Sequence, residues 1–383
     1  MKRHFFNKIN ISPFFLLSFF LLSCDENKTV MKSDEVLPPL PPFELEATPE
    51  PSIASNQVVV ISHSRYLFHN LALEIRDYYN SALIHFNENS SDQISEKLKI
   101  INPQYAIVVL PPFIIDLNSV ADLFFSFCSL DDEIDMDVGY CYITGSKVED
   151  ARDLFYRNKA NTAVIDSYLG ISHVFDGDEW CHSAVNRYKN IFDQNNWEAN
   201  TIIVNSDSWL ADKNVELSKF DQNQMIFFIG HGSGDTSCDL NVTDVDCLNL
   251  TGCCIFAGSC YTGMTSYKSP DREFIALKII EKGAFFYVSN VGGNGWDNVW
   301  FIAENLCKSD IALGDAVQRG INQQMEWRDI RELNILHYDY QNESDLLESD
   351  LMTKVTNSMA RIIPFGDPLF KPQLKSRLDI SLE

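Results

Sequence analysis

Apolar and polar positions alternate along most of the chain with two different periods. Short runs rich in β-branched and aromatic residues predict strands, and the segments between them carry apolar residues at helical spacing, as at Leu71 and Ile75. Buried strands separated by helices predict a mostly parallel sheet with helices on both faces, a three-layer α/β/α fold. The predicted strands are 58–62, 83–86, 105–110, 140–144, 162–165, 201–204, 225–229, 253–257 and 284–288. The predicted helices lie near Leu71 and Ile75, near Ile94 and Leu98, at 148–156, 181–192 and 274–282, and onward to about Arg361.

The first 23 residues have a different pattern. Three basic residues are followed by an apolar stretch at 14–22, which is too short to span a bilayer that needs roughly 20 residues. The stretch ends in LLSC, with a small residue directly before Cys24. This order predicts a bacterial lipoprotein signal over residues 1–23, cleaved so that a lipid on Cys24 anchors the protein to a membrane. The alternative is an ordinary secretory signal followed by a chance cysteine.

Proline and glutamate dominate the next segment, residues 24–55, which contains LPPLPPFELEATPEPS and lacks apolar periodicity. Such a composition is typical of an extended tether. The folded part is then expected over residues 56–375. We expect two sub-domains, at about 56–150 and 151–375, that share one body.

The chain is acidic, with a formal net charge of -24. This charge argues against nucleic acid as a partner, because phosphates would be repelled. Proteins or peptides and, through the lipid, a membrane are the expected partners. The signal predicts a location in the bacterial cell envelope, at the outer membrane or cell surface in preference to the inner membrane. Asp25 leaves both membranes open, because an aspartate beside the lipidated cysteine retains lipoproteins at the inner membrane in some bacteria and accompanies surface export in others.

Two candidate catalytic residues follow predicted strands. His231 stands in IGHGS after strand 225–229, and Cys260 stands in AGSCYTG after strand 253–257. If the two strands are parallel neighbours, both residues emerge at the same sheet edge and form a Cys-His dyad. Gly232 lacks a side chain, so its N–H can join that of Cys260 in an oxyanion hole. The alternatives are a simple turn at His231 and a buried structural cysteine.

The ordered motifs IGHGS, AGSCYTG, EKGAFFYVSNVGGNGW and PFGDPLF resemble the catalytic domain of gingipain-type cysteine peptidases, part of the caspase-like group. The resemblance covers about 56–372 and is strongest from residue 225. It implies a caspase-like fold and cysteine endopeptidase activity, with His231 and Cys260 as the catalytic pair. It also implies a substrate pocket walled by Trp296, with an acid at its floor for which Asp178 and Glu179 are the nearest equivalents.

One position departs from the family's pattern. Tyr140 replaces an arginine that is usual in the family, which leaves the contacts between the two halves uncertain. A third group that orients His231 is not evident, although Asp166 is a candidate.

The remaining cysteines and acids suggest no cofactor. Nine cysteines remain besides Cys24, and an odd number in an exported protein suggests a free thiol. A Cys238–Cys247 disulfide would rigidify the loop after His231. We expect no catalytic metal, because Cys and His pairs at zinc-ligand spacing are absent from the sequence. Aspartates in 235–246 leave a structural calcium ion open.

We therefore predict a lipid-anchored cysteine endopeptidase. One alternative keeps Cys260 as the nucleophile but passes the acyl group to an amine, as sortase-like members of the family do in protein export. A second alternative is a surface lipoprotein that binds peptides in the same cleft without catalysis.

Overall fold

The computed structural model describes residues 57–88, 90–131, 135–160, 164–165, 167–173, 186, 189, 198–204, 217–220, 223–266, 273–292, 297–308, 310–327 and 359–374. These residues all lie within one unit, which spans 49–383. None of the described helices is long and apolar enough to cross a membrane. The predicted signal peptide, Cys24 and the tether lie outside the described residues.

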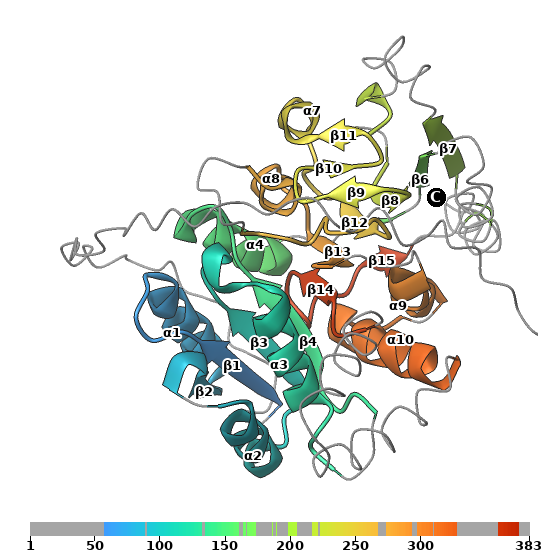
Figure 1. Cartoon of the computed structure of the whole chain (residues 1–383). Coiled ribbons are helices and arrows are strands. Elements are labelled where there is room, and N and C mark those ends of the chain that lie inside the picture. Colours follow the sequence, from blue (N-terminus) through green and yellow to red (C-terminus); the bar gives the residue numbers. More distant parts are fainter. Residues whose placement is uncertain are drawn as a thin grey trace, which may run out of the picture. The chain divides into compact units, whose positions relative to one another are not determined.

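Four parallel strands form the first part of the main sheet (Figure 1), in the order β2-β1-β3-β4. Their residues are almost all buried and apolar, as expected for strands covered on both faces. Polar caps set the limits of a connecting helix: Ser90 and Gln93 form a capping box at its start, and Asn102 ends it in a left-handed conformation. The elements are β1 (Val58–Ser62), α1 (Phe68–Tyr79), β2 (Ala82–His85), α2 (Ser91–Ile101), β3 (Tyr105–Val109), α3 (Leu117–Phe127) and β4 (Gly139–Ile143).

Five more parallel strands form the second part, in the order β13-β12-β8-β6-β7. Phenylalanines of three neighbouring strands interlock in its centre. Phe227 stacks on Phe256 at 5.3 Å between ring centroids, and Phe256 meets Phe286 edge to face at 5.1 Å. The elements are α4 (Val148–Ala160), β6 (Ser167–His173), β7 (Glu198–Val204), β8 (Met225–Ile229), β12 (Cys254–Ala257), α8 (Ile275–Glu281), β13 (Phe286–Asn290), α9 (Asp297–Lys308) and α10 (Leu313–Trp327).

The strand β14 (Ile362–Phe365) joins the two parts into one ten-stranded sheet. It pairs in parallel with β4 through Phe365 and Tyr142, and antiparallel with β13. Tyr140, where the sequence departs from the family's pattern, also bridges this junction, because its hydroxyl donates to the carbonyl of Ile362 at 2.9 Å. Tyr140 therefore contributes a contact between the first part of the sheet and the joining strand.

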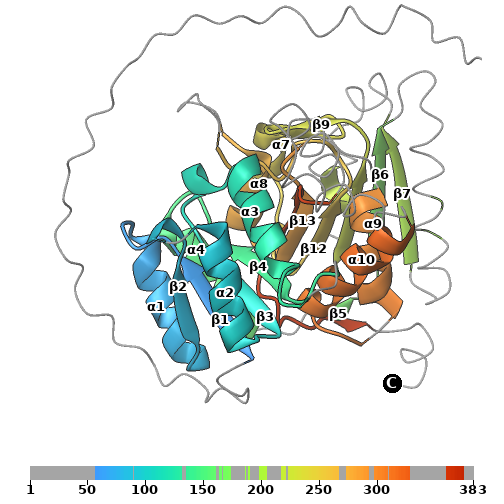
Figure 2. The same ribbon diagram turned by 60° about the horizontal axis from the view of Figure 1, so that its bottom comes forward.

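Helices cover both faces of the sheet, as the sequence predicted. On one face α1 packs on β1 and β3, α4 packs on β4 and α8 packs on β13, while α1 and α8 both contact α4. On the other face α10 packs on β4, α9 packs on β12, and α2 contacts β2 and α3. Figure 2 shows β1 and β2 between α1 and α2. The chain is therefore a three-layer α/β/α protein with a mostly parallel sheet.

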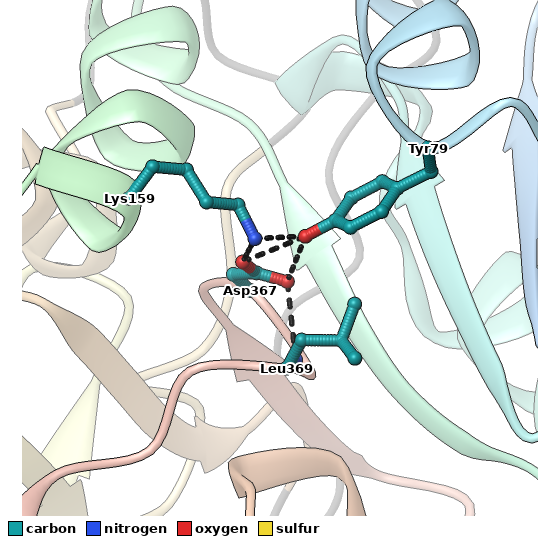
Figure 3. Close-up of polar contacts among 4 residues, drawn as sticks. All are labelled: Tyr79, Lys159, Asp367 and Leu369. Carbon is teal, nitrogen blue, oxygen red and sulfur yellow. Dashed lines mark hydrogen bonds and ion pairs between the residues drawn. The ribbon is translucent and has the colours of Figure 1, made fainter. Parts of the chain in front are cut away.

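A buried polar cluster fastens the turn that follows β14 (Figure 3). Asp367 is fully buried and forms an ion pair with Lys159 of α4. The hydroxyl of Tyr79, at the end of α1, donates to its carboxylate oxygens at 3.2 and 3.4 Å, and the N–H of Leu369 donates to it at 3.1 Å. Lys159 also donates to the Tyr79 hydroxyl. One carboxylate thus joins the ends of two helices to the turn after the central strand.

A small three-stranded sheet leaves the main sheet after β8 (Figure 1). It consists of β9 (Gly232–Ser233), β10 (Thr236–Ser237) and β11 (Leu240–Asn241), followed by the short helix α7 (Val242–Asp246). A separate pair, β5 (Val164–Ile165) with β15 (Gln373–Leu374), ties the end of the described chain to the segment before β6.

Five elements differ from the sequence-based expectations, and one expected helix lies almost wholly outside the described residues. The predicted strand 162–165 contributes only two residues, and they pair with β15 outside the main sheet. The strand that enters the main sheet there is β6, which the sequence analysis missed, as it missed α3 and β14. The strand expected at 284–288 begins two residues later, at Phe286. The predicted helix at 181–192 lies outside the described residues except for positions 186 and 189.

Candidate active site

Two neighbouring parallel strands bring the segments of His231 and Cys260 to the same sheet edge. In β8 and β12, Phe228 is opposite Ala257, and the pairing continues as the N–H of Gly258 donates to the carbonyl of Phe228 at 2.8 Å. His231 follows the end of β8, and Cys260 follows the end of β12. The neighbouring, parallel arrangement that the sequence-based hypothesis required is therefore present.

Gly232 lies in direct contact with the segment that carries Cys260. A Cβ atom placed on Gly232 would lie 2.6 Å from Thr262 Cγ2, 2.8 Å from Ser259 Cβ and 2.9 Å from the carbonyl oxygen of Cys260. Distances below 3.0 Å are not tolerated between such atoms, so no larger residue fits here without movement. Because His231 precedes Gly232, the histidine and the cysteine belong to two segments that touch.

Hydrogen bonds hold the cysteine segment against β13 on its other side. The N–H of Tyr261 donates to the carbonyl of Gly292 at 3.0 Å, and the N–H of Gly263 donates to that of Asn290 at 2.8 Å. Tyr261 has φ +60°, a left-handed conformation that is unusual for a residue with a side chain. The backbone therefore turns sharply directly after Cys260.

The histidine segment is fastened by its own hairpin. The N–H of Cys238 donates to the carbonyl of His231 at 2.9 Å, which closes the loop formed by β9 and β10. The hydroxyl of Ser237 donates to that of Ser259 at 3.2 Å, directly before Cys260. The loop after β8 and the loop after β12 are thus joined by side chains as well as by the close approach at Gly232.

Exposure separates Cys260 from most other thiols of the described chain. Cys260 is half-buried and His231 is exposed, so reagents and substrates can reach this edge. Burial raises the pKa of the Cys238 thiol to about 12, and it raises the pKa of Cys141 and Cys254 well above the ordinary range. A buried neutral thiol is a poor nucleophile, because the thiolate is the reactive form.

Arg361 is a charged neighbour that the sequence analysis missed. Its side chain lies over Gly292, where an added Cβ would be 2.5 Å from Arg361 Cδ, and its carbonyl accepts from the N–H of Val291 at 2.8 Å. Burial lowers the pKa of the Arg361 guanidinium, and the charges of Tyr261 and Cys260 oppose that shift. Arg361 thus adds a positive charge near Cys260. Arg361 reaches this position because it directly precedes β14, a strand that the sequence pattern did not predict. The spacing of residues in the sequence therefore gave no indication that Arg361 lies near Cys260.

Several predicted site residues lie outside the described residues. They are Trp296, Asp178 and Glu179 of the expected pocket, Asp166 as a group behind His231, and Cys24. Their roles stay predictions.

The suggested Cys238–Cys247 disulfide is not formed, because both are free thiols. Cys238 is buried, with Sγ 3.9 Å from the carbonyl of Ile171, whereas Cys247 is exposed and donates to the carbonyl of Thr243 at 3.5 Å.

Acidic residues of the 235–246 segment have protein partners. Ser233 donates to Asp235 at 2.5 Å, Asn241 and Asp244 form a capping box, and Asp246 pairs with Lys282 at 2.9 Å. In the described ranges there is no group of three or more His, Cys, Asp or Glu residues placed to hold a metal ion. The structural calcium ion remains an untested prediction.

Comparisons with solved structures identify the fold. The Arg-specific cysteine proteinase gingipain R superposes with a TM-score of 0.58 at 13% sequence identity, covering 85% of this chain and 80% of gingipain R. The RgpB pro- and mature-domain complex of Porphyromonas gingivalis gives 0.56 at 14% identity, covering 82% and 79% of the two chains. A further protease structure gives 0.54 at 10% identity, with coverage of 84% and 79%. No protein-family model and no curated protein matches the sequence. The chain has the caspase-like α/β fold that the sequence predicted.

Proposed function

We propose that this protein is a cysteine endopeptidase whose nucleophile is Cys260 and whose acid-base residue is His231. The main support is the contact of Gly232 with the carbonyl of Cys260, because it joins the two strand-end segments that carry a thiol and an imidazole. The likeness of the fold to cysteine proteinases adds support from outside the chain.

The proposed reaction has two steps. The Cys260 thiolate bonds to the peptide carbonyl carbon while the N–H groups of Gly232 and Cys260 stabilise the oxyanion. The carbon–nitrogen bond then breaks, and His231 gives its proton to the leaving amine. In the second step His231 takes a proton from water, whose oxygen displaces the thiolate and releases the new carboxylic acid, which then loses its proton to solvent. The cysteine and histidine both return to their starting states.

We propose further that substrates are selected by a pocket containing Trp296, with Asp178 or Glu179 as its acid, and that a lipid on Cys24 holds the protein at the cell envelope. A pocket acid implies cleavage after Arg or Lys. Asp178→Asn and Glu179→Gln variants, assayed on paired Arg and norleucine peptides, test this part. Mass spectrometry of the N-terminal peptide from membranes tests the lipid.

The test of catalysis compares the protein with Cys260→Ala, His231→Ala and the control Cys247→Ala on a pooled fluorogenic peptide library. Cys247 is another accessible thiol of the described chain, on the helix α7. We expect cleavage by the protein and by Cys247→Ala, and at least a 1,000-fold loss in the other two. Cleavage that survives Cys260→Ala would refute the assignment. An amide-linked product in the presence of an added amine would identify acyl transfer to that amine instead of hydrolysis.

A further inference from the structure

The described part of the chain exposes six large apolar side chains, and their distribution is uneven. Three of them, Tyr66, Leu67 and Phe113, come from two neighbouring strand ends, and a fourth, Tyr261, directly follows Cys260. Phe113 is 57% exposed and Tyr66 is 38% exposed. Scattered apolar residues on a surface are ordinary, but three of them gathered in one place can mark a binding site.

Tyr66, Leu67 and Phe113 are called the aromatic patch below. Tyr66 follows β1, and Phe113 lies in the short 3-10 helix (Pro112–Ile114) after β3, the parallel neighbour of β1. The two rings meet edge to face, with 4.9 Å between their centroids and an interplanar angle of 83°. The His63 ring lies 4.6 Å from that of Tyr66. Each exposed ring is thus held in a fixed orientation by an aromatic neighbour.

The aromatic patch is connected to the cysteine segment by hydrogen bonds. The hydroxyl of Thr265 donates to the carbonyl of Pro112 at 2.8 Å, directly before Phe113. The hydroxyl of Ser266 donates to the carbonyl of Ile115 at 3.4 Å, on the other side of Phe113. Thr265 is five residues from Cys260, a span of at most about 18 Å. The loop that carries Phe113 is therefore fixed to the loop that carries the nucleophile.

Size and position indicate what this patch binds. A stable protein–protein interface needs about 20–30 residues on each side, far more than three side chains. A peptide in an extended conformation advances about 3.3 Å per residue, so fewer than ten residues can cover both Cys260 and Phe113. Rigid aromatic side chains suit an apolar side chain of such a peptide, because they lose little conformational freedom on binding.

We propose that Tyr66, Leu67 and Phe113 form a subsite for one large apolar side chain of the peptide substrate, several residues away from the bond attacked by Cys260. The proposal rests on the peptidase function proposed above. It assigns a binding role to the first part of the sheet, which supplies none of the expected catalytic residues.

The test uses peptide pairs with a scissile sequence found in the library assay. Each pair carries Leu or Ser at one of the positions within eight residues on either side of the bond. We expect at least a tenfold higher kcat/KM for Leu at one position. Phe113→Ser and Tyr66→Ser should remove that preference, so that kcat/KM becomes equal for the Leu and the Ser peptide. The control Ile100→Ser alters an 84% exposed residue on α2 and should keep the preference.

Different outcomes separate the subsite from the catalytic proposal. Cleavage with equal kcat/KM for Leu and Ser at every position, or a preference that survives in both patch variants, would overturn the subsite and leave the peptidase intact. If the protein cleaves no peptide, binding of fluorescent library peptides that differ only by Leu or Ser at one position is measured by anisotropy with Cys260→Ala. Tighter binding of a Leu peptide that Phe113→Ser abolishes supports the subsite without catalysis, and its absence overturns it. Dissociation of a dimer by Phe113→Ser in sedimentation would assign the patch to a second copy and also overturn the proposal. Circular dichroism confirms that each variant is folded.

Discussion

Replacing Asp367 with asparagine tests how strongly the buried cluster after β14 holds the fold. The side chain keeps its shape but loses its charge, so Lys159 loses its ion-pair partner while its own side chain is only 17% exposed. Removing one partner of a buried ion pair costs about 3–5 kcal/mol, because the other charge stays buried without compensation. Lys159 keeps the hydroxyl of Tyr79 and lies 4.5 Å from the centre of that ring. We therefore expect the lower end of this range, about 3 kcal/mol of unfolding free energy.

Urea denaturation of Asp367→Asn, followed by circular dichroism and by fluorescence, measures this loss. A matched control is Asp310→Asn, which removes the carboxylate of an exposed ion pair with Lys371 at 2.9 Å. The urea concentration at the unfolding midpoint should not change measurably in this control, since exposed ion pairs contribute little to stability. Lys159→Met is also measured alone, and a second variant combines Asp367→Asn with Lys159→Met. Because no unpaired charge then remains, we expect it to recover about 2 kcal/mol relative to Asp367→Asn alone.

Two results would refute the reasoning. A loss below about 1 kcal/mol in Asp367→Asn would mean that water or backbone groups replace the carboxylate at little cost. If the loss of unfolding free energy in the double variant equals the sum of the losses in the two single variants, Lys159 and Asp367 act independently. Either result would mean that the ion pair contributes little to the stability with which α1 and α4 are held to the turn after β14.

Three further predictions concern the candidate active site. Arg361→Gln removes a positive charge near Cys260. Alkylation of Cys260 by iodoacetamide at pH 7 should therefore slow about three- to tenfold, and Arg361→Lys should restore most of the rate. Equal alkylation rates in the protein and in Arg361→Gln would contradict this. Gly232→Ala places a Cβ 2.9 Å from the Cys260 carbonyl oxygen. Peptide cleavage should fall at least 100-fold, while the free energy of unfolding should fall by only about 1–3 kcal/mol. Unimpaired cleavage would show that the segment moves to accept the added Cβ. Brief alkylation of the folded protein, followed by mass spectrometry, should label Cys247 and Cys260 but not Cys238, because burial raises the pKa of the Cys238 thiol to about 12. Early labelling of Cys238 would show that the fold opens locally around it.

The predicted parts of the fold are those whose strands are apolar throughout. Residues 58–62 and 225–229 are buried at every position, so their composition alone indicates central strands. The strand β6 was not predicted, because Ser167 and Gly170 interrupt its apolar run. In β14, Pro364 argues against a central strand because proline cannot donate to a sheet. For α3 a signal was present, since Asp116 caps it through the N–H of Ser119 at 2.8 Å.

The candidate site was predictable only as far as it depends on strand ends. His231 and Cys260 each follow a recognisable strand, so a parallel sheet is enough to bring their segments to one edge. Arg361 approaches Cys260 from an antiparallel strand that the pattern did not reveal. The aromatic patch depends on the turns after β1 and β3 and on hydrogen bonds from Thr265, which no local pattern specifies. Contacts between loops follow from tertiary packing, and periodicity carries no information about them.

The thiols of the described residues differ in ways that bear on nucleophilic catalysis. Cys247 is exposed and is the C-cap residue of the short helix α7. Buried thiols such as Cys254 and Cys307 resist ionisation because burial raises their pKa. Cys260 is half-buried, its segment touches the segment of His231, and the guanidinium of Arg361 lies near it. The described thiols are therefore chemically unequal, and Cys260 combines accessibility with a segment that touches the segment of His231.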